Sequence, residues 1–437
     1  MKLFTAGRRL RPLNGSVDSL AGDKSISHRC AIFSLLSDRP SRISNFLEAE
    51  DTLHSLQIAK ELGATVKSES GGVVIIPPKE IEEPRTILDC GNAGTAMRIY
   101  TGLLAARKGF FVLSGDRYLN NRPMKRVVDP LRSIGAEIYG REEGAFAPIA
   151  IHGRGDLSPF EFHSAISSAQ VKTAMILAAL GAKGKSSFSE SFPSRDHTER
   201  MLLSMGAGIK SDGHKIAVAE MKSPLKPLEI TVPSDPSSGF FFAAAAALTE
   251  GSNLLIRNVT LNPTRIEAYR ILEKMGAKVD FIERENRYEP IGDIRVRHAS
   301  LRAIDVSEKI PWLIDELPAL AILFARAEGI SSVTGASELR VKESDRIKSI
   351  VANLVKCGVN AKELSDGFTI EGQKQIRGTE VDSFGDHRVA MSFAIAALIS
   401  DSEITVRDTK CVNTSFPNFA EIFSALCGDL KEREIAD

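Results

Sequence analysis

The sequence predicts an α/β protein of two domains, built from six copies of a unit of about 70 residues. Three observations support this prediction. The chain has 437 residues, which is more than a single hydrophobic core usually spans. A helical pattern that ends in glycine recurs along the chain, and a second, more apolar helical pattern recurs in the same periods.

The first pattern is an amphipathic helix, then glycine and a small residue, then a short strand-like run. Its full copies are SLQIAKELGATV, VVDPLRSIGAEI, RMLLSMGAGI, AYRILEKMGAKV and IVANLVKCGVNA, with glycines at Gly63, Gly135, Gly206, Gly276 and Gly358. Glycine between a helix and alternating apolar residues indicates a helix C-cap that leads into a strand. FAEIFSALCG, which ends at Gly428, is expected to be a sixth copy cut short by the C-terminus.

The second pattern is a helix rich in alanine and leucine. Its copies begin at Gly22, Gly91, Ser167, Asp235, Asp315 and Gly385. Because these helices are apolar all round, we expect them to be buried, with the amphipathic helices of the first pattern covering the outside. Six units divide into two domains of three, and the segment Thr231–Gly239, rich in Pro and Ser, is a plausible hinge between them.

Composition limits the function. Lys and Arg together number 56, as do Asp and Glu, and the isoelectric point is about 7.1. This balance argues against binding of nucleic acid or membrane surfaces, which needs a basic excess. The longest apolar run, Phe240–Leu248, is too short to cross a bilayer. The start of the chain has basic residues but no apolar run after them, so no secretory signal is predicted.

The five cysteines form no C-x-x-C pair and none has zinc spacing to a histidine. We therefore expect free thiols, no metal and a cytosolic location.

Polar residues gather where the buried helices begin. The clusters are Lys24, Ser25 and Arg29; Asn92, Gly94, Thr95 and Arg98; Ser167, Ser168, Gln170 and Lys172; Asp315 and Glu316; and Asp386, His387 and Arg388. Any single cluster is best explained by helix caps and surface residues. Repetition of the clusters favours a binding site instead, because parallel buried helices would bring their N-termini to one face and together form an anion site. Ser27 and His28 keep the simpler interpretation as cap or packing residues.

Three loops add further charges. Arg122 and Lys125 precede an amphipathic helix, and Arg195, Asp196 and His197 occupy the equivalent place in the next unit. LRVKESDR holds Arg340, Lys342, Glu343, Asp345 and Arg346. Such a charge run alone is usually a solvated helix face. Several clustered arginines, however, favour a doubly anionic small ligand, since the guanidinium fork matches phosphate and carboxylate.

Eight motifs then appear in one order: GDKSISHR, LDCGNAGTAMR, NNRPM, SSAQVKTA, SRDHTE, LRVKESDR, FGDHRVAM and TSFPNF. With them the chain resembles the 5-enolpyruvylshikimate-3-phosphate synthase (3-phosphoshikimate 1-carboxyvinyltransferase) family almost end to end. The resemblance implies a two-domain inside-out α/β barrel of six βαβαββ repeats, three in each domain, with helix N-termini facing the interdomain cleft. It places residues 23–233 in the N-terminal domain, and residues 1–22 with 234–437 in the C-terminal domain.

The resemblance also implies the activity: transfer of the enolpyruvyl group of phosphoenolpyruvate to the 5-hydroxyl of shikimate 3-phosphate, by addition and elimination, without metal or organic cofactor. The residues implied to hold phosphoenolpyruvate are Lys24, Asn92, Gly94, Arg122, Gln170, Arg346 and Arg388. Those implied to hold shikimate 3-phosphate are Ser25, Arg29, Ser168, Gln170, Arg195, Asp315 and Lys342. Asp315 is the implied base on the hydroxyl and Glu343 the acid and base at the methylene carbon, with Lys24 and His387 completing the catalytic group. The expected partners are these two substrates alone, bound by a monomer.

An acid at the methylene carbon needs a raised pKa, whereas the surrounding cations should lower that of Glu343. Repulsion among those cations also predicts domains that stand open when empty and close on ligand. The chain departs from the family at Thr414, where many members have lysine, and Lys410 is a candidate substitute. SAQVK and SRDHTE resemble the second of the family's two sequence classes, and Gly94, often alanine in glyphosate-tolerant members, is retained.

Three alternatives are weaker. The sister enzyme that acts on UDP-N-acetylglucosamine has a loop cysteine, which GDRYLNNRPM lacks. A fold relative acting on RNA 3′-phosphate ends fits poorly with neutral charge and 6% aromatic residues. A catalytically dead scaffold would leave Lys24, Asp315, Glu343, His387 and Arg388 without purpose.

Overall fold

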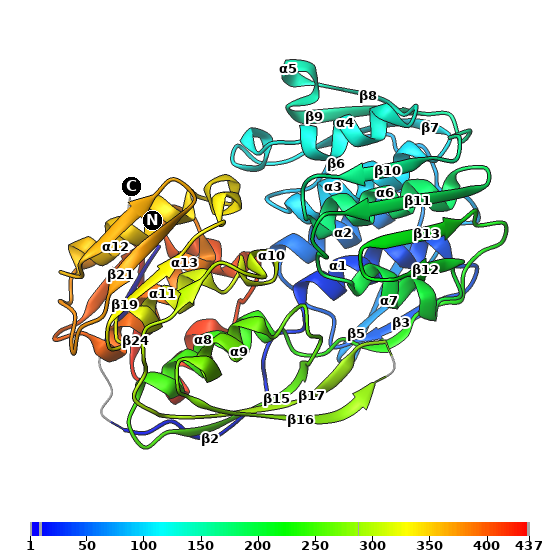
Figure 1. Ribbon diagram of the computed structural model, residues 1–437. Coiled ribbons are helices and arrows are strands. Elements are labelled where there is room, and N and C mark those ends of the chain that lie inside the picture. Colours follow the sequence, from blue (N-terminus) through cyan, green and yellow to red (C-terminus); the bar gives the residue numbers. More distant parts are fainter. Residues whose placement is uncertain (1, 8–10, 287, 435–437) are drawn as a thin grey trace. The chain divides into compact units, whose positions relative to one another are not determined.

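The structure is a computed structural model that describes residues 2–7, 11–286 and 288–434. The chain divides into two compact units (Figure 1). The N-unit is Gly22–Val232, and the C-unit combines Met1–Ala21 with Pro233–Asp437.

Six four-stranded sheets, three in each unit, share one topology. In each, a parallel pair is extended by two antiparallel strands. The N-unit sheets, in spatial order, are β14 (Glu229–Thr231), β3 (Ser41–Ser44), β5 (Gly72–Ile76) and β4 (Thr65–Glu69); β6 (Leu88–Asp89), β7 (Gly109–Ser114), β9 (Phe146–Gly153) and β8 (Glu137–Gly140); and β10 (Glu161–Ser164), β11 (Lys185–Glu190), β13 (Lys215–Ala219) and β12 (Ile209–Ser211).

The C-unit repeats this arrangement. Its sheets are β2 (Asn14–Val17), β15 (Asn253–Thr260), β17 (Pro290–Arg297) and β16 (Lys278–Asn286); β18 (Asp305–Val306), β19 (Ile330–Val333), β21 (Gly367–Glu371) and β20 (Ala361–Leu364); and β22 (Glu380–Asp382), β23 (Ile404–Arg407), β1 (Lys2–Ala6) and β24 (Leu430–Glu434). Each unit pairs its own strands: β2 joins β15 in the C-unit although the N-unit lies between them in sequence, and β14, the last strand of the N-unit, pairs with β3.

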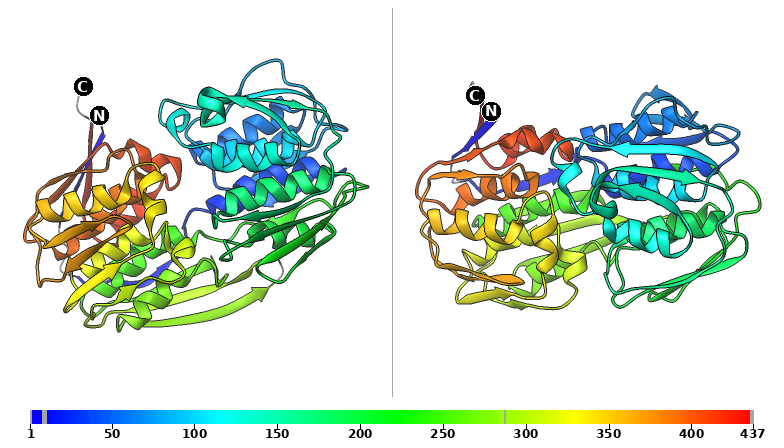
Figure 2. Two further views of the ribbon diagram at one scale, coloured as in Figure 1. Left: turned by 45° about the horizontal axis from the view of Figure 1, so that its top comes forward. Right: turned by 90° about the horizontal axis from the view of Figure 1, so that it is seen from above.

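Each unit buries three apolar helices at its centre, as expected. They are α1 (Lys24–Phe33), α3 (Gly94–Ala105) and α6 (Ala169–Gly181) in the N-unit, and α8 (Pro236–Leu248), α11 (Leu317–Phe324) and α13 (His387–Ala396) in the C-unit. Residues 236–247 of α8 are all buried, because a helix without a polar face has no side to turn to water. Figure 2 shows the helices and sheets of each unit from two further directions.

Amphipathic helices lie beside the sheets, each burying one face. They are α2 (Glu50–Glu61), α4 (Lys125–Ser133), α7 (His197–Ser204), α9 (Glu267–Lys274), α12 (Arg346–Lys356) and α14 (Phe419–Leu426). Shorter helical segments are α5 (Arg141–Gly144), α10 (Ile310–Leu313), η1 (Ser34–Leu36), η2 (Leu119–Asn121), η3 (Ser337–Val341), η4 (Ala397–Ile399) and η5 (Thr409–Thr414). No helix among the described residues is long and apolar enough to span a membrane.

The six glycines of the first pattern act as predicted. Gly63, Gly135, Gly206, Gly276, Gly358 and Gly428 all have positive φ and follow the amphipathic helices. A side chain at such a φ would be strained, so glycine ends each helix and turns the chain into the next strand.

The sixth copy is cut short, as expected, because a single described strand follows its amphipathic helix. After Gly428 the chain forms β24, and the N-terminal strand β1 pairs with both β23 and β24. β1 thus occupies the position that β5, β9, β13, β17 and β21 hold in the other sheets. The sixth sheet is complete because its missing strand comes from the opposite end of the chain.

Candidate active site

Acidic and hydroxyl side chains cap several of the helices expected to bind anions. Asp23 accepts a hydrogen bond from the Ile26 backbone N–H at 2.9 Å. The N-cap residues Ser168, Asp235 and Asp386 accept similar bonds at the starts of α6, α8 and α13, and Asp345 does so at α12. For these residues the helix-cap interpretation is confirmed. The Asp23 carboxylate also places a negative charge next to the basic first turn of α1.

Ser27 and His28 are packing residues, as expected. Both are fully buried. The Ser27 hydroxyl accepts a bond from Leu47 N, and His28 Nδ1 lies 2.7 Å from Ser55 Oγ. Burial, with the charges of Lys24 and Arg29, lowers the pKa of His28 well below its usual value. A neutral imidazole at this position adds no positive charge to the helix start.

In the N-unit, Lys24 and Arg29 are held by different contacts. Lys24 Nζ lies 2.5 Å from Asp51 Oδ2, on α2. The Arg29 guanidinium is buried and donates to the Thr198 and Thr173 hydroxyls at 2.8 and 2.9 Å. Sequence reasoning missed Asp51 because nothing in the pattern links it to a lysine 27 residues earlier.

A continuous polar chain joins α3 and α6. Arg98 Nη1 donates to Gln170 Oε1 at 2.7 Å, and Gln170 Nε2 donates to Thr95 Oγ1 at 2.9 Å. A Cβ atom added at Gly94 would lie 2.9 Å from Arg98 Nη1 and 3.1 Å from Arg122 Nη1. Five residues of the predicted clusters and loops therefore converge, and the missing side chain of Gly94 leaves room for the Arg122 guanidinium.

The other predicted N-unit residues lie on neighbouring helix starts and loops. Asn92 precedes α3 and donates from Nδ2 to Asp116 Oδ2 at 2.9 Å. Ser25 lies in the first turn of α1, and its carbonyl accepts from Arg29 Nη1 at 2.9 Å. Arg195 is half-buried in the loop before α7, and exposed Lys125 starts α4.

Lys172 does not lie at an open helix start. Its ammonium is buried and pairs with Glu199 Oε1 at 2.8 Å and Glu190 Oε1 at 3.1 Å. It also donates to the Ser194 carbonyl at 3.0 Å, directly before Arg195. The same Glu190 oxygen accepts from the Ser194 N–H at 2.7 Å. Lys172 therefore anchors the loop that presents Arg195.

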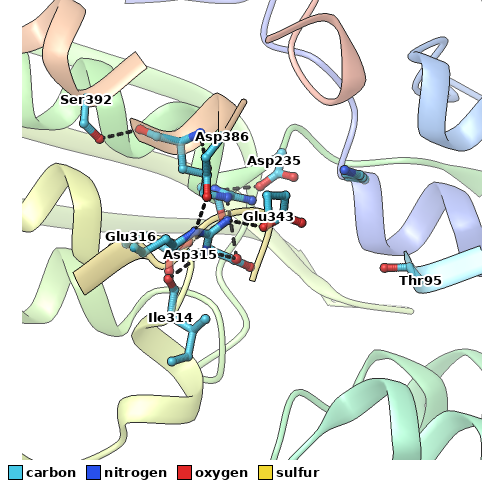
Figure 3. A network of polar contacts seen from close by, with 12 residues as sticks. Thr95, Asp235, Ile314, Asp315, Glu316, Glu343, Asp386 and Ser392 are labelled. Atoms are coloured by element: carbon cyan, nitrogen blue, oxygen red, sulfur yellow. Dashed lines mark hydrogen bonds and ion pairs between the residues drawn. The ribbon is translucent and has the colours of Figure 1, made fainter. Parts of the chain in front are cut away.

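In the C-unit, Arg346 binds three carboxylates (Figure 3). Its Nε donates to Asp386 Oδ2 at 2.8 Å and its Nη2 to Glu343 Oε2 at 2.7 Å. Its Nη1 lies 3.4 Å from Asp315 Oδ1 and 3.2 Å from the Ile314 carbonyl. Burial alone would lower the pKa of Arg346, but the three carboxylates outweigh it and raise that pKa above its usual value.

The remaining C-unit residues surround this cluster. Arg388 Nε lies 3.5 Å from the same Asp315 oxygen, and His387 is buried beside it in the first turn of α13. Lys342 contacts Glu338 at 3.2 Å. Arg340 instead forms ion pairs with Asp345 and Glu363, each at 2.8 Å, and does not join this cluster.

A second buried network was not predicted. Arg265, fully buried, donates to Asp235 Oδ1 at 2.9 Å and to Ser237 Oγ at 3.1 Å. Ser237 in turn donates to Glu316, the N-cap residue of α11. The network ties the starts of α8 and α11 together, and Glu316 thus belongs to the support of the site.

Near the C-terminus, the Thr414 hydroxyl donates to the Cys411 carbonyl at 2.7 Å, within η5. Lys410 is exposed in the same segment.

The sequence profile of EPSP synthase (3-phosphoshikimate 1-carboxyvinyltransferase) matches residues 8–423. The chain belongs to the EPSP synthase family. A 3-phosphoshikimate 1-carboxyvinyltransferase of Nitratiruptor sp. is 58% identical over 415 residues, which are 94% of this chain and 95% of that protein. The same enzyme of Wolinella succinogenes is 55% identical over 421 residues, 96% of each chain.

Solved structures agree with the family assignment. EPSP synthase from Acinetobacter baumannii superposes with a TM-score of 0.88 and 37% identity, covering 99% of this chain and all of that one. The resemblance read from the eight motifs and the two-domain α/β fold are thereby confirmed. The family profile and the named relatives also favour the EPSP synthase activity over the sister enzyme, the RNA-end enzyme and the catalytically dead scaffold.

Proposed function

We propose that this chain transfers the enolpyruvyl group of phosphoenolpyruvate to the 5-hydroxyl of shikimate 3-phosphate, a step in the synthesis of chorismate and the aromatic amino acids. The observation that carries the proposal is the family match over nearly the whole chain. The clusters around Gly94 and Arg346 support it, because the first gathers guanidinium groups that can hold an anion and the second places carboxylates beside a guanidinium.

We assign phosphoenolpyruvate to two groups of residues. In the N-unit they are Lys24, Asn92, Gly94, Arg122 and Gln170, and in the C-unit Arg346 and Arg388. The convergence of Gly94, Arg122 and Gln170 supports the first group, since a guanidinium beside a glycine leaves a charged, open surface for a phosphate. Shikimate 3-phosphate is assigned to Ser25, Arg29, Ser168, Gln170, Arg195, Asp315 and Lys342.

In the proposed chemistry, Asp315 takes the proton of the 5-hydroxyl of shikimate 3-phosphate. The hydroxyl oxygen at the same time attacks C2 of phosphoenolpyruvate. Glu343, protonated beforehand, delivers its proton to C3, which gives a tetrahedral adduct. In the second step Glu343 removes a proton from C3, the C2–C3 double bond re-forms and the phosphate leaves C2 with its electron pair. Lys24, Arg122 and His387 are assigned to stabilise the charge that develops on the phosphate.

Arg346 orients both proposed acid–base groups. One guanidinium contacts Asp315 through Nη1 and Glu343 through Nη2. Of its five N–H donors, four have partners in Asp386, Ile314, Asp315 and Glu343. Bidentate binding of the substrate carboxylate therefore requires at least one of these contacts to yield. Glu343 is the candidate, because its release would also free it to act at C3.

The test is phosphate release from phosphoenolpyruvate with shikimate 3-phosphate as acceptor, against UDP-N-acetylglucosamine as the alternative acceptor. We expect turnover with the first and none with the second. Absence of turnover with the shikimate ester, in protein shown to be folded, would refute the proposal. Turnover with the nucleotide sugar alone would select the sister activity.

Glu343→Gln tests the role of one residue. The amide keeps the size of the side chain and cannot shuttle a proton, so binding of both substrates should persist while turnover falls at least about a thousandfold. A variant with near-normal turnover would remove Glu343 from the mechanism.

We also propose a monomer in the cytoplasm. The five free cysteines, four of them buried, support a reducing compartment. Light scattering of the purified chain tests the monomer.

A further inference from the structure

A cavity of about 370 Å³ lies in the N-unit, outside the candidate active site. It is bounded by Leu35–Ser37 after α1, by Arg107 and Lys108 after α3, and by Pro78–Ile81 after β5. Met221–Pro224 after β13 complete it, and the Met221 N–H bonds the Leu180 carbonyl of α6. Gly94 begins α3 and the cavity meets its other end, so about 18 Å of helix separates the two.

The cavity is lined by more cations than anions. Lys79, Arg107, Lys108 and Lys222 face it, with Glu80 as the one acid in the lining. The ends of α1, α3 and α6 contribute roughly half a negative charge each. Three helix ends thus offset about half of the three net positive charges, and a positive excess remains.

Arg107 is half-buried, whereas the three lysines of this group are exposed. Its Nε is inaccessible to solvent and has no hydrogen-bond partner among the described residues. No carboxylate among the described residues forms an ion pair with Arg107 either. Burial lowers the pKa of Arg107, yet an arginine stays protonated in any protein environment. The fold therefore holds a half-buried guanidinium without a counter-ion, whose Nε is shielded from water and unpaired, an arrangement that costs stability unless a ligand offsets it.

Apart from Ser37 and Ser223, the rest of the lining is apolar. Leu36 is fully buried beneath it, and Pro78, Ile81, Met221 and Pro224 form the walls. A volume near 370 Å³ lies within the range of small-molecule sites. A ligand that matches the lining combines one anionic head with a compact apolar body.

We propose that this cavity is a second ligand site, which binds a small organic acid with its carboxylate on the Arg107 guanidinium. Lys79, Lys108 and Lys222 strengthen the field at the entrance, and the apolar walls enclose the body of the ligand. The proposal is independent of the catalytic assignments, because none of the lining residues belongs to them.

The probe is benzoate, measured by equilibrium dialysis with the full chain. We expect saturable binding of one benzoate, weakened at least about tenfold in Arg107→Gln, since a charge-assisted pair is lost. Lys210→Gln, on the exposed strand β12 of the same unit, is the matched control and should bind as the wild type does. Toluene, the neutral analogue, should bind at least tenfold more weakly than benzoate.

The active site also attracts anions, so a second variant separates the two sites. Arg122→Gln should leave benzoate binding unchanged. If Arg122→Gln weakens binding as much as Arg107→Gln, benzoate occupies the active site and the proposal fails. Failure of wild-type protein to bind benzoate saturably up to tens of millimolar also overturns it, as does equal binding of toluene.

The urea midpoint of unfolding gives a second test, with a variant that we expect to be more stable than the wild type. Arg107→Met keeps the side-chain volume and removes the unpaired charge, so the urea midpoint without ligand should rise and benzoate should no longer shift it. If Arg107 only balances the helix ends, the midpoint falls instead and wild-type protein shows no benzoate-dependent shift. Lys222→Gln should weaken benzoate binding by a smaller factor than Arg107→Gln, because Lys222 is exposed.

Discussion

Lys172→Met removes a buried cation that pairs with two carboxylates outside the reacting groups. The Lys172 side chain is 1% exposed, and its partners Glu190 and Glu199 are 0% and 10% exposed. Methionine fills a similar volume and removes the only cation that contacts both carboxylates in the described chain. Breaking a buried ion pair from one side costs about 3–5 kcal/mol. That is a large part of the ~5–15 kcal/mol by which a typical domain is stable.

The pH dependence of this variant is fixed in sign. Burial raises the pKa of Glu199 above its ordinary value of 4.5, while Lys172 acts in the opposite direction. A carboxyl whose pKa is higher in the folded state stabilises fully below its unfolded pKa, and the contribution is lost as pH rises through the folded pKa. Without Lys172 that pKa rises further, so the destabilisation of Lys172→Met should grow from pH 5 to pH 8.

Urea unfolding of wild type, Lys172→Met, Glu199→Gln and the double variant measures these effects. Glu199→Gln keeps the Lys172–Glu190 pair and should cost less than about 1 kcal/mol at pH 7, with a flatter pH profile. Lys172→Met should cost less in the Glu199→Gln background, because one buried charge is already gone. A loss under about 1 kcal/mol for Lys172→Met at pH 7, or a loss independent of pH, would contradict the reasoning.

The same variant has a kinetic signature. Lys172 bonds the Ser194 carbonyl, directly before Arg195, which is assigned to shikimate 3-phosphate. The KM for shikimate 3-phosphate should therefore rise several-fold in Lys172→Met, while the KM for phosphoenolpyruvate changes little. Equal increases in both constants would indicate a general loss of folded protein rather than a displaced loop.

Three further predictions follow from single contacts. Gly94→Ala places a Cβ atom 3.1 Å from Arg122 Nη1, so the KM for phosphoenolpyruvate should rise several-fold while stability changes by under about 1 kcal/mol; an unchanged KM in steady-state assays would exclude this steric effect. Arg346→Lys keeps the charge, but an ammonium cannot reach Asp386, Asp315 and Glu343 together, so kcat should fall at least about a hundredfold. A kcat equal to that of the wild type would show that the Arg346 guanidinium is not needed for turnover. Burial raises the pKa of the Cys357 thiol to about 11, and it also raises the pKa values of Cys30, Cys90 and Cys411. Ellman's reagent at pH 8 should therefore react slowly with the native protein, whereas all five thiols should react in denaturant. Rapid labelling of Cys357 in the native protein would contradict its burial.

The periodic features of the fold could be predicted from sequence because they depend on local physics. A glycine after an amphipathic helix is required by positive φ wherever it occurs, and all six such glycines end helices here. An alanine-rich helix without a polar face, such as residues 236–247, has to be buried in any tertiary context. The completion of the sixth sheet by β1 could not be predicted in this way. It pairs residues about 400 positions apart, and no local pattern specifies such a partner.

For the candidate site, sequence by itself determined the residue types and their places at helix starts, since caps and charged turns are local and the motifs are distinctive. Only the tertiary structure decided the partners. It placed Asp51 on Lys24, buried Lys172 between Glu190 and Glu199, and set three carboxylates around Arg346. These contacts join residues distant in sequence, and their energies depend on burial, which a linear pattern does not show. The basic start of α1 is the clearest case: sequence shows a concentration of positive charge there, and the fold supplies Asp23, Asp51 and a neutral His28 around it.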